Sequence, residues 1–148
     1  MYAVIDISST SISMLVCGKD GARPAYKNRE GLSALSYTEG GKLTEHGVEK
    51  ICEKIAVFQD QCKKFGVERL YVVSTAAMRF VDNAEEVFAE IKAKTGAVVN
   101  QLDGETEAYC DLIANEKFRS MTGPVIIDIG GASIELCDLT KGGKDGIK

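Results

Sequence analysis

Histidine is almost absent from this sequence, and its scarcity limits the chemistry that the chain can support. The one histidine, His46, lies at the polar start of an expected helix. Catalysis by Ser-His-Asp or Cys-His groups is therefore disfavoured, because those nucleophiles depend on an adjacent imidazole base. Carboxylates, hydroxyls, backbone N–H groups and a bound metal remain as sources of reactivity.

Cysteine pairs with metal-binding spacing are also missing. The five cysteines, at positions 17, 52, 62, 110 and 137, include no Cys-x-x-Cys pair, which removes the usual zinc-ligand spacing. Their number is odd and their spacing irregular, so we expect most of them to be buried, reduced thiols.

Neither a long apolar run nor an excess of basic residues is present. No stretch suits a membrane-spanning helix, and the start of the chain lacks the basic and apolar regions of a signal peptide. We therefore expect a cytoplasmic protein without a membrane partner. The formal net charge of −4 argues against a nucleic-acid-binding surface, so a polyanionic ligand would depend on local backbone donors and a few cations.

The length and the apolar pattern fit one compact α/β domain. The 148 residues are 45% hydrophobic and 27% charged. The expected strands cover residues 2–7, 12–17, 25–30, 70–74 and 97–102. The expected helices cover residues 44–65, 84–94 and 105–119. A meander of strands followed by alternating strands and helices predicts a mixed sheet with helices packed on it.

Local signals mark the ends of these elements. Thr44 and Asn83 are expected to cap the first two helices, and Gly66 and Gly96 to end them. The remaining segments have expected structures too: a loop at 31–42, a final hairpin ending near 139, and a disordered tail at 141–148.

Two stretches of the chain share one pattern. Residues 4–12 read V-I-D-I-S-S-T-S-I, and residues 126–134 read I-I-D-I-G-G-A-S-I. Each predicts a strand, a turn of small residues and a second strand, and successive N–H groups in such a turn can bind an anion. One copy alone is more often an ordinary hairpin, whereas two copies favour two phosphate-binding turns that face each other. Asp128 and Glu135 flank the second turn with carboxylates that suit Mg²⁺.

Four motifs together resemble those of the exopolyphosphatase / guanosine pentaphosphate phosphatase family. They are D-I-S-S-T-S at 6–11, S-T-A-A-M-R at 74–79, G-E-T-E-A at 104–108 and D-I-G-G-A-S-I-E at 128–135. The resemblance implies a lobe of the actin/Hsp70/sugar-kinase (ribonuclease H-like) fold, with the active site between two lobes. Residues 1–122 would form the first lobe and residues 123–148 the beginning of the second, whose remainder is absent.

The resemblance also implies roles for individual residues. Glu107 would activate the attacking water, and Asp128 and Glu135 would hold Mg²⁺ or Mn²⁺ and complete the catalytic set. The phosphate-binding residues would be Asp6, Ser9, Ser11, Arg79, Gly130, Gly131 and Ser133. From the residues alone, a first-turn acid favoured by the helix dipole is the preferred interpretation of Glu107. For Arg79, a solvent-facing side chain and a phosphate ligand are equally favoured.

Three functions remain open at this point. The first is Mg²⁺-dependent release of terminal phosphate from polyphosphate or guanosine pentaphosphate, (p)ppGpp. The second is a non-catalytic module that binds polyphosphate or a nucleotide; the missing second lobe and the departures from the family motifs favour it. Those departures are Ser8, Thr10, Thr106, Ala132 and Ile134. The third, ranked last, is ATP use like that of sugar kinases.

We also expect the exposed edge of the last hairpin to be covered by a second copy, in a homodimer, or by the first lobe.

Overall fold

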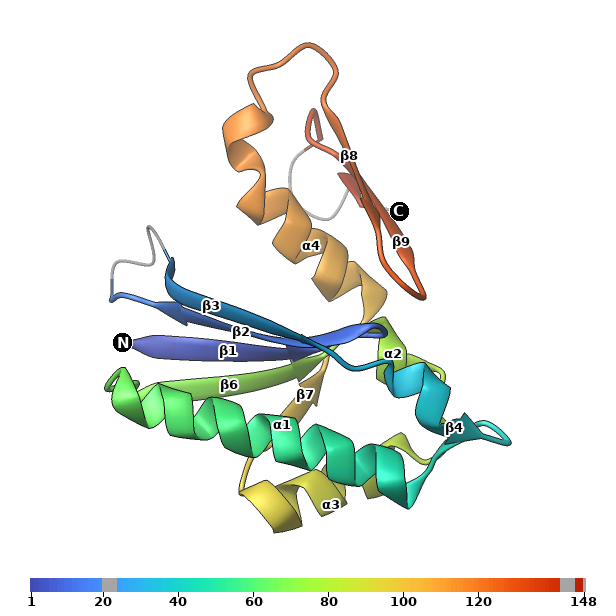
Figure 1. Ribbon diagram of the computed structural model, residues 1–148. Coiled ribbons are helices and arrows are strands. Elements are labelled where there is room, and N and C mark those ends of the chain that lie inside the picture. Colours follow the sequence, from blue (N-terminus) through green and yellow to red (C-terminus); the bar gives the residue numbers. More distant parts are fainter. Residues whose placement is uncertain (20–23, 142–145, 148) are drawn as a thin grey trace.

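The computed structural model describes residues 1–19, 24–141 and 146–147. Its largest element is a five-stranded sheet in the order β3-β2-β1-β6-β7 (Figure 1). The strands are β1 (Tyr2–Ile7), β2 (Ser11–Cys17), β3 (Pro24–Gly31), β6 (Arg69–Ser74) and β7 (Val99–Gln101). Strands β1 to β3 form an antiparallel meander, whereas β6 runs parallel to both β1 and β7. The predicted mixed α/β sheet is therefore present.

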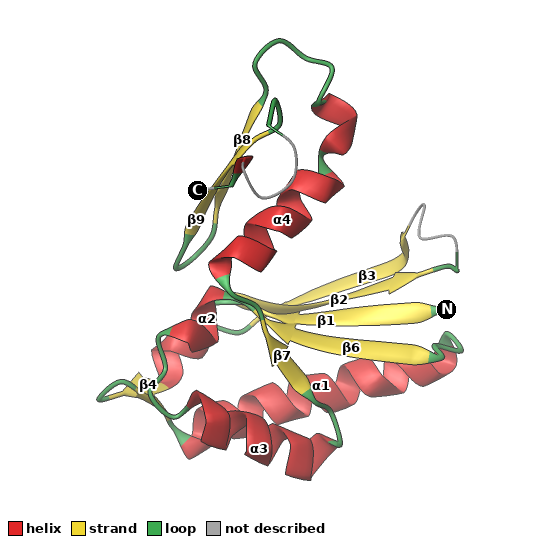
Figure 2. Cartoon of the chain, turned by 180° about the vertical axis from the view of Figure 1, so that it is seen from behind, coloured by secondary structure: helices red, strands yellow, loops and turns green. Residues whose placement is uncertain are grey.

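Two helices cover one face of this sheet, and α4 and the last hairpin lie beyond its other face (Figures 1 and 2). The covering helices are α1 (Glu45–Lys64) and α3 (Ala84–Thr95), and the single-turn α2 (Ala76–Arg79) follows β6 directly. The main core lies between α1, α3 and the sheet. Its fully enclosed side chains include Ile5, Ile7, Ile12, Met14, Ile55 and Phe58. No helix of the described ranges is both long enough and apolar enough to span a membrane.

The ends of α1 follow from local sequence. The Thr44 side chain accepts a hydrogen bond from Gly47 N at 3.2 Å, which satisfies one of the free N–H groups of the first turn. At the other end Gly66 has a φ of +65°, a conformation that glycine adopts without steric cost. Both predicted ends of this helix are confirmed.

The prediction that Asn83 caps α3 is wrong for its side chain, which makes no hydrogen bond to the first turn of the helix. Its Oδ1 instead accepts from Leu43 N at 2.9 Å, and its Nδ2 donates to Leu43 O at 3.1 Å. The side chain thus pairs with the short strand β5 (Lys42–Leu43), which competes successfully with the helix end for the same amide group.

The connection between β3 and α1 is more ordered than the predicted loop. It contains a 3₁₀ turn, η1 (Ala34–Tyr37), and a small hairpin of β4 (Thr38–Glu39) and β5. Gly40 and Gly41 make the tight turn of this hairpin with φ values of +54° and +82°. Two-residue hairpins need such backbone angles, so part of the segment predicted to be a loop forms a β-hairpin.

A second, smaller unit follows β7. It consists of α4 (Gly104–Ala114), the 3₁₀ turn η2 (Glu116–Phe118), β8 (Val125–Ile129) and β9 (Ile134–Asp138). Helix α4 packs along the β8–β9 hairpin (Figure 1), with a small core of its own. The buried residues of that core are Ala108, Leu112, Cys137 and Leu139. The division into lobes at residue 122 stays a prediction, and the structure adds that α4 packs with the hairpin.

The helix predicted over 105–119 is too long. Helix α4 ends at Ala114, because Asn115 leaves helical geometry while its side-chain Nδ2 donates to Asp111 O at 2.9 Å. Asparagine commonly competes in this way for backbone carbonyls. The tail was expected to be disordered, yet Ile147 pairs with Cys137 and packs on the small core. Residues 142–145 and 148 lie outside the described residues.

Candidate active site

A cleft of about 330 Å³ lies between the β1–β2 turn of the first unit and the β8–β9 turn of the second. Many of the residues predicted for the site line this cleft: Asp6, Ser9, Glu107, Asp128, Gly130, Gly131 and Ser133. Thr75 and Ala76, at the carboxyl end of β6, also line it. This is the sheet edge at which ligands of α/β folds usually bind. Each remaining predicted residue lies next to a residue of the cleft: Ser11 next to Ser8, Arg79 next to Glu107, and Glu135 opposite Asp128.

The two turns have the same local structure. Ser8 N donates to Ser11 O at 2.9 Å, and Gly130 N donates to Ser133 O at 2.9 Å. The strands beside them pair in matching registers, with Ile7 opposite Ile12 and Ile129 opposite Ile134. The repeated sequence pattern is therefore repeated in the backbone.

The two turns also contact each other directly. A Cβ placed on Gly131 would lie 2.9 Å from Thr10 Cγ2 and 3.0 Å from Ser9 Cβ. Such distances are shorter than a side chain can tolerate, so a glycine is needed for this close approach. Two turns with small side chains and potential N–H donors thus meet across the cleft.

Ser8 and Arg29 shape the first turn. The Ser8 hydroxyl lies 2.9 Å from Ser11 O and 3.0 Å from Ser11 Oγ, and Arg29 Nε donates to Ser11 Oγ at 3.0 Å. No described residue other than glycine has a positive φ, so Ser8 occupies the family's glycine position without left-handed strain. The sequence does not single out Arg29, because a charged residue in the alternating pattern of β3 is typical of a solvent-exposed strand face.

Arg79 joins two of the predicted carboxylates. Its Nη1 donates to Glu107 Oε2 at 2.7 Å and to Leu102 O at 3.0 Å, and its Nη2 lies 3.7 Å from Glu135 Oε1. The side chain is only 19% exposed, so the solvent-facing alternative is wrong. A guanidinium fork suits such a bridge, and it fixes the orientation of the Glu107 carboxylate beside the cleft.

Asp6 lies at the end of β1, in the floor of the cleft. Its Oδ1 is enclosed and has no hydrogen-bond partner among the described residues. Burial and the Glu107 charge raise the pKa of Asp6 to about 6, although Arg29 acts in the opposite direction. A buried carboxylate without a donor is unstable as an anion, so this position favours a proton or a ligand donor.

Asp111 is a site residue that the sequence analysis did not identify. It lies one helical turn after Glu107 on α4, and carboxylate oxygens of Asp111, Asp128 and Glu135 all lie within 4.8 Å of one another. Burial, followed by the charges of Asp128, Glu135 and Glu107, raises the pKa of Asp111 to about 6. The i, i+4 spacing from Glu107 is the signal that could have revealed it, because such residues share one helix face.

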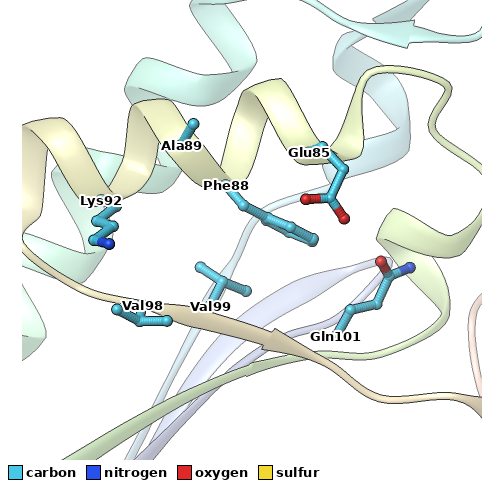
Figure 3. A pocket seen from close by; sticks show the side chains of 7 residues that line it. All are labelled: Glu85, Phe88, Ala89, Lys92, Val98, Val99 and Gln101. Carbon is cyan, nitrogen blue, oxygen red and sulfur yellow. The ribbon is translucent and has the colours of Figure 1, made fainter.

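A hollow of about 320 Å³ lies elsewhere, between α3 and β7. Phe88 and Val99 lie between the helix and the strand, with Lys92 and Glu85 toward opposite ends (Figure 3). It brings together none of the residues predicted for chemistry. We therefore assign the candidate site to the cleft between the two turns.

Comparison with known proteins agrees with the resemblance seen in the motifs. Residues 26–143 match the Ppx/GppA phosphatase family. The chain belongs to this family. Exopolyphosphatase 1 of Mycobacterium tuberculosis is 28% identical over 141 residues, which are 90% of this chain and 40% of that protein.

Solved structures of the Ppx/GppA family support the fold. The chain superimposes on the Aquifex aeolicus family member with a TM-score of 0.80 and 27% identity, over 99% of this chain and 48% of that one. An exopolyphosphatase from Cytophaga hutchinsonii, 20% identical, has the same fold with a TM-score of 0.74, over 99% of this chain and 47% of that one. The predicted actin-like α/β fold is confirmed. The chain spans about 40–50% of the length of these relatives.

The residues at the cleft fit the divalent cation expected for the Ppx/GppA family. Mg²⁺ and Mn²⁺ prefer carboxylate oxygens, and Asp128 and Glu135 pair opposite each other on β8 and β9. The enclosed Asp111 Oδ2 has no hydrogen-bond partner in the described part of the chain. Three converging carboxylates with one guanidinium beside them are an arrangement that a divalent cation would stabilise.

Proposed function

We propose that the cleft is the phosphate-binding half of a phosphohydrolase that releases terminal phosphate from polyphosphate or guanosine pentaphosphate. The observation that carries this proposal is the meeting of two structurally equivalent turns beside the oriented carboxylate of Glu107. Phosphoryl transfer depends mainly on positioning and charge neutralisation, and the cleft offers groups for both. The names of the relatives support the substrate class.

The proposed roles follow from where each group lies. The Gly130 and Gly131 backbone and the hydroxyls of Ser9 and Ser133 line the cleft, where they would donate to phosphoryl oxygens. Arg29, which also lines it, would supply positive charge to a chain whose net charge is −4. Each added charge-assisted hydrogen bond is stronger than a neutral one.

Glu107 would act as the general base. It would take a proton from a water molecule while the water oxygen forms a bond to the terminal phosphorus and the bridging P–O bond breaks. The leaving phosphate chain keeps the electron pair of that bond. Arg79 would hold Glu107 in place rather than bind the substrate directly, which revises the phosphate-binding role predicted for Arg79. A Mg²⁺ or Mn²⁺ ion at Asp128 and Glu135 would neutralise charge on the phosphate oxygens.

A binding module without catalysis is the alternative. The close ion pair between Glu107 and Arg79 favours it, because a base engaged at 2.7 Å is less available to a water molecule.

In either case we propose a cytoplasmic protein. A homodimer, in which the second copy covers the β8–β9 hairpin, is also part of this proposal.

Glu107→Gln separates the two functions. Phosphate release from polyphosphate and from guanosine pentaphosphate would be measured for this chain and for a polypeptide that continues through the second lobe. Loss of a general base should reduce turnover by about 10²–10⁴-fold while leaving polyphosphate binding intact. Glu105→Gln, an exposed acid two residues earlier on the same helix, is the matched control. Equal turnover by Glu107→Gln and the parent protein would rule out the assigned base.

A further inference from the structure

Three carboxylates from three different elements converge beside the cleft, and one of them, Asp128, lines it. Asp128 and Glu135 come from β8 and β9, and Asp111 comes from α4. Glu135 is only 5% exposed, and the Oδ2 atom of Asp111 is enclosed without a hydrogen-bond partner in the described chain. Of these three carboxylates, Arg79 forms an ion pair only with Glu135 among the described contacts, at 3.7 Å.

The position of Asp111 is unfavourable for an anion in three ways. It lies in the last turn of α4, where the helix dipole disfavours negative charge. That turn contains no basic residue to compensate. The two neighbouring carboxylates add like-charge repulsion in a partly desolvated place. A carboxylate that is destabilised by all three effects needs a positively charged partner or a proton.

We propose that Asp111 is a third ligand, contributed by α4, of the divalent cation that Asp128 and Glu135 hold. This inference rests on the proposed function only in expecting such a cation at the cleft. Its consequence is that one helix face positions two groups one turn apart, Glu107 for the water and Asp111 for the metal. The cation would then also join α4 to the hairpin.

The alternative is a carboxyl group that stays protonated and shares its proton with Asp128 or Glu135. An asparagine at position 111 distinguishes the two cases, because its amide has the same shape and can donate the hydrogen bond that a protonated acid would donate. If Asp111 is protonated, Asp111→Asn should bind the metal as tightly as the parent. If Asp111 is a metal ligand, Asp111→Asn should bind the metal more weakly.

The test is titration of the 148-residue chain with Mn²⁺, with free Mn²⁺ measured by electron paramagnetic resonance at pH 7.5. We expect Asp111→Asn to weaken Mn²⁺ binding by at least about 10–100-fold, the loss seen when partners of metal ligands are removed. Asp128→Asn should weaken it at least as much. Glu116→Gln, an exposed acid just beyond α4, is the control for loss of one charge and should bind Mn²⁺ as the parent does.

A second measurement compares the Tm of Asp111→Asn with that of the parent. If Asp111 is a metal ligand, the effect of the substitution on Tm has opposite signs without and with the ion. Without metal, Asp111→Asn should have a higher Tm than the parent, because it removes like-charge repulsion. With saturating Mg²⁺, the parent should gain stability and the variant should gain little. Asp111→Leu should show the same Tm changes without metal and with Mg²⁺. This variant controls for an effect that is specific to the asparagine side chain. Circular dichroism would verify the helix content of each variant.

Two outcomes would overturn this inference. One is Mn²⁺ binding by Asp111→Asn as tight as that of the parent while Asp128→Asn loses it. The other is absence of Mn²⁺ binding by the parent chain. Both are independent of turnover. If Mn²⁺ binds through Asp111 but neither this chain nor the polypeptide that continues through the second lobe releases phosphate, the proposed hydrolysis is refuted and the metal ligand stays established.

Discussion

The β1–β2 and β8–β9 hairpins share a sequence pattern and a turn, yet their surroundings differ completely. Ile5, Ile7, Ile12 and Met14 are at most 1% exposed, because α1 and α3 cover their face of the sheet. The equivalent residues of the second hairpin are 41–73% exposed: Ile127, Ile129, Ile134 and Leu136. The other face of that hairpin packs on α4.

This difference shows that turn geometry and burial are separate consequences of one pattern. The turn depends on residues within a few positions of one another, whereas burial depends on elements far along the chain. Because the chain spans about 40–50% of its relatives, we expect the apolar face of β8–β9 to be covered in the longer polypeptide or by a second copy.

Alanine substitutions at equivalent isoleucines should give the largest contrast. Ile5→Ala removes a fully enclosed side chain and should lower the free energy of unfolding by about 2–5 kcal/mol. Ile127→Ala, at a residue that is 59% exposed, should change it by less than about 0.5 kcal/mol. Urea denaturation followed by circular dichroism measures both. A large loss for Ile127→Ala would show that a second copy covers the hairpin at the concentration used.

The contact between the two turns should give an intermediate effect. In Gly131→Ala the new methyl would press against Thr10 and Ser9, and overpacking of this kind costs about 1–3 kcal/mol. Polyphosphate binding should weaken in parallel, because the turns must separate. Gly104→Ala, where an added methyl meets open space, is the matched control. Parent-like stability and binding by Gly131→Ala would mean that the two turns separate freely.

The pH dependence of Asp6 should give the smallest effect. Its pKa is raised from 3.8 to about 6 in the folded chain, so folding binds a proton between these values. Its contribution to stability is complete below about pH 4 and is lost as the pH rises through 6. Asp6→Asn should therefore gain on the order of 1–2 kcal/mol over the parent between pH 4 and pH 7.5.

Urea denaturation across this pH range, without divalent cations, measures the Asp6 effect as the difference between parent and variant. Glu86→Gln, an exposed acid of α3, is the control for surface charge. A difference that stays constant with pH would show that Asp6 titrates normally. The equivalent residue of the second hairpin, Asp128, is exposed on β8. The two aspartates therefore differ in burial in the same way as the isoleucines of the two hairpins.

The parts of the fold that could be predicted are those encoded locally. Apolar runs located the strands of the sheet, and Thr44 and Gly66 marked the ends of α1 because their effects act within one helical turn. The Asn83 side chain was assigned wrongly because its partner, Leu43, lies 40 positions away. The length of α4 was overestimated because the competing bond of Asn115 is not visible in hydrophobic periodicity.

The site shows the same division. The residues of both turns were found because each turn is a contiguous motif, and the family resemblance added Glu107. Arg29 and Asp111 were missed because each becomes informative only when strands or helices from different parts of the chain meet. The catalytic, phosphate-binding and metal-binding roles of all these residues stay predictions until they are measured.

Arg79 finally implies a mechanical division of the site. The helix that carries Glu107 shares its small core with the hairpin that carries Glu135, whereas Arg79 comes from α2 in the first unit. Its hydrogen bond to Glu107 and its longer ion pair with Glu135 therefore connect the two units. Movement of the units away from each other would break both contacts. The base and the carboxylate cluster would then move together, away from the turn that contains Ser9.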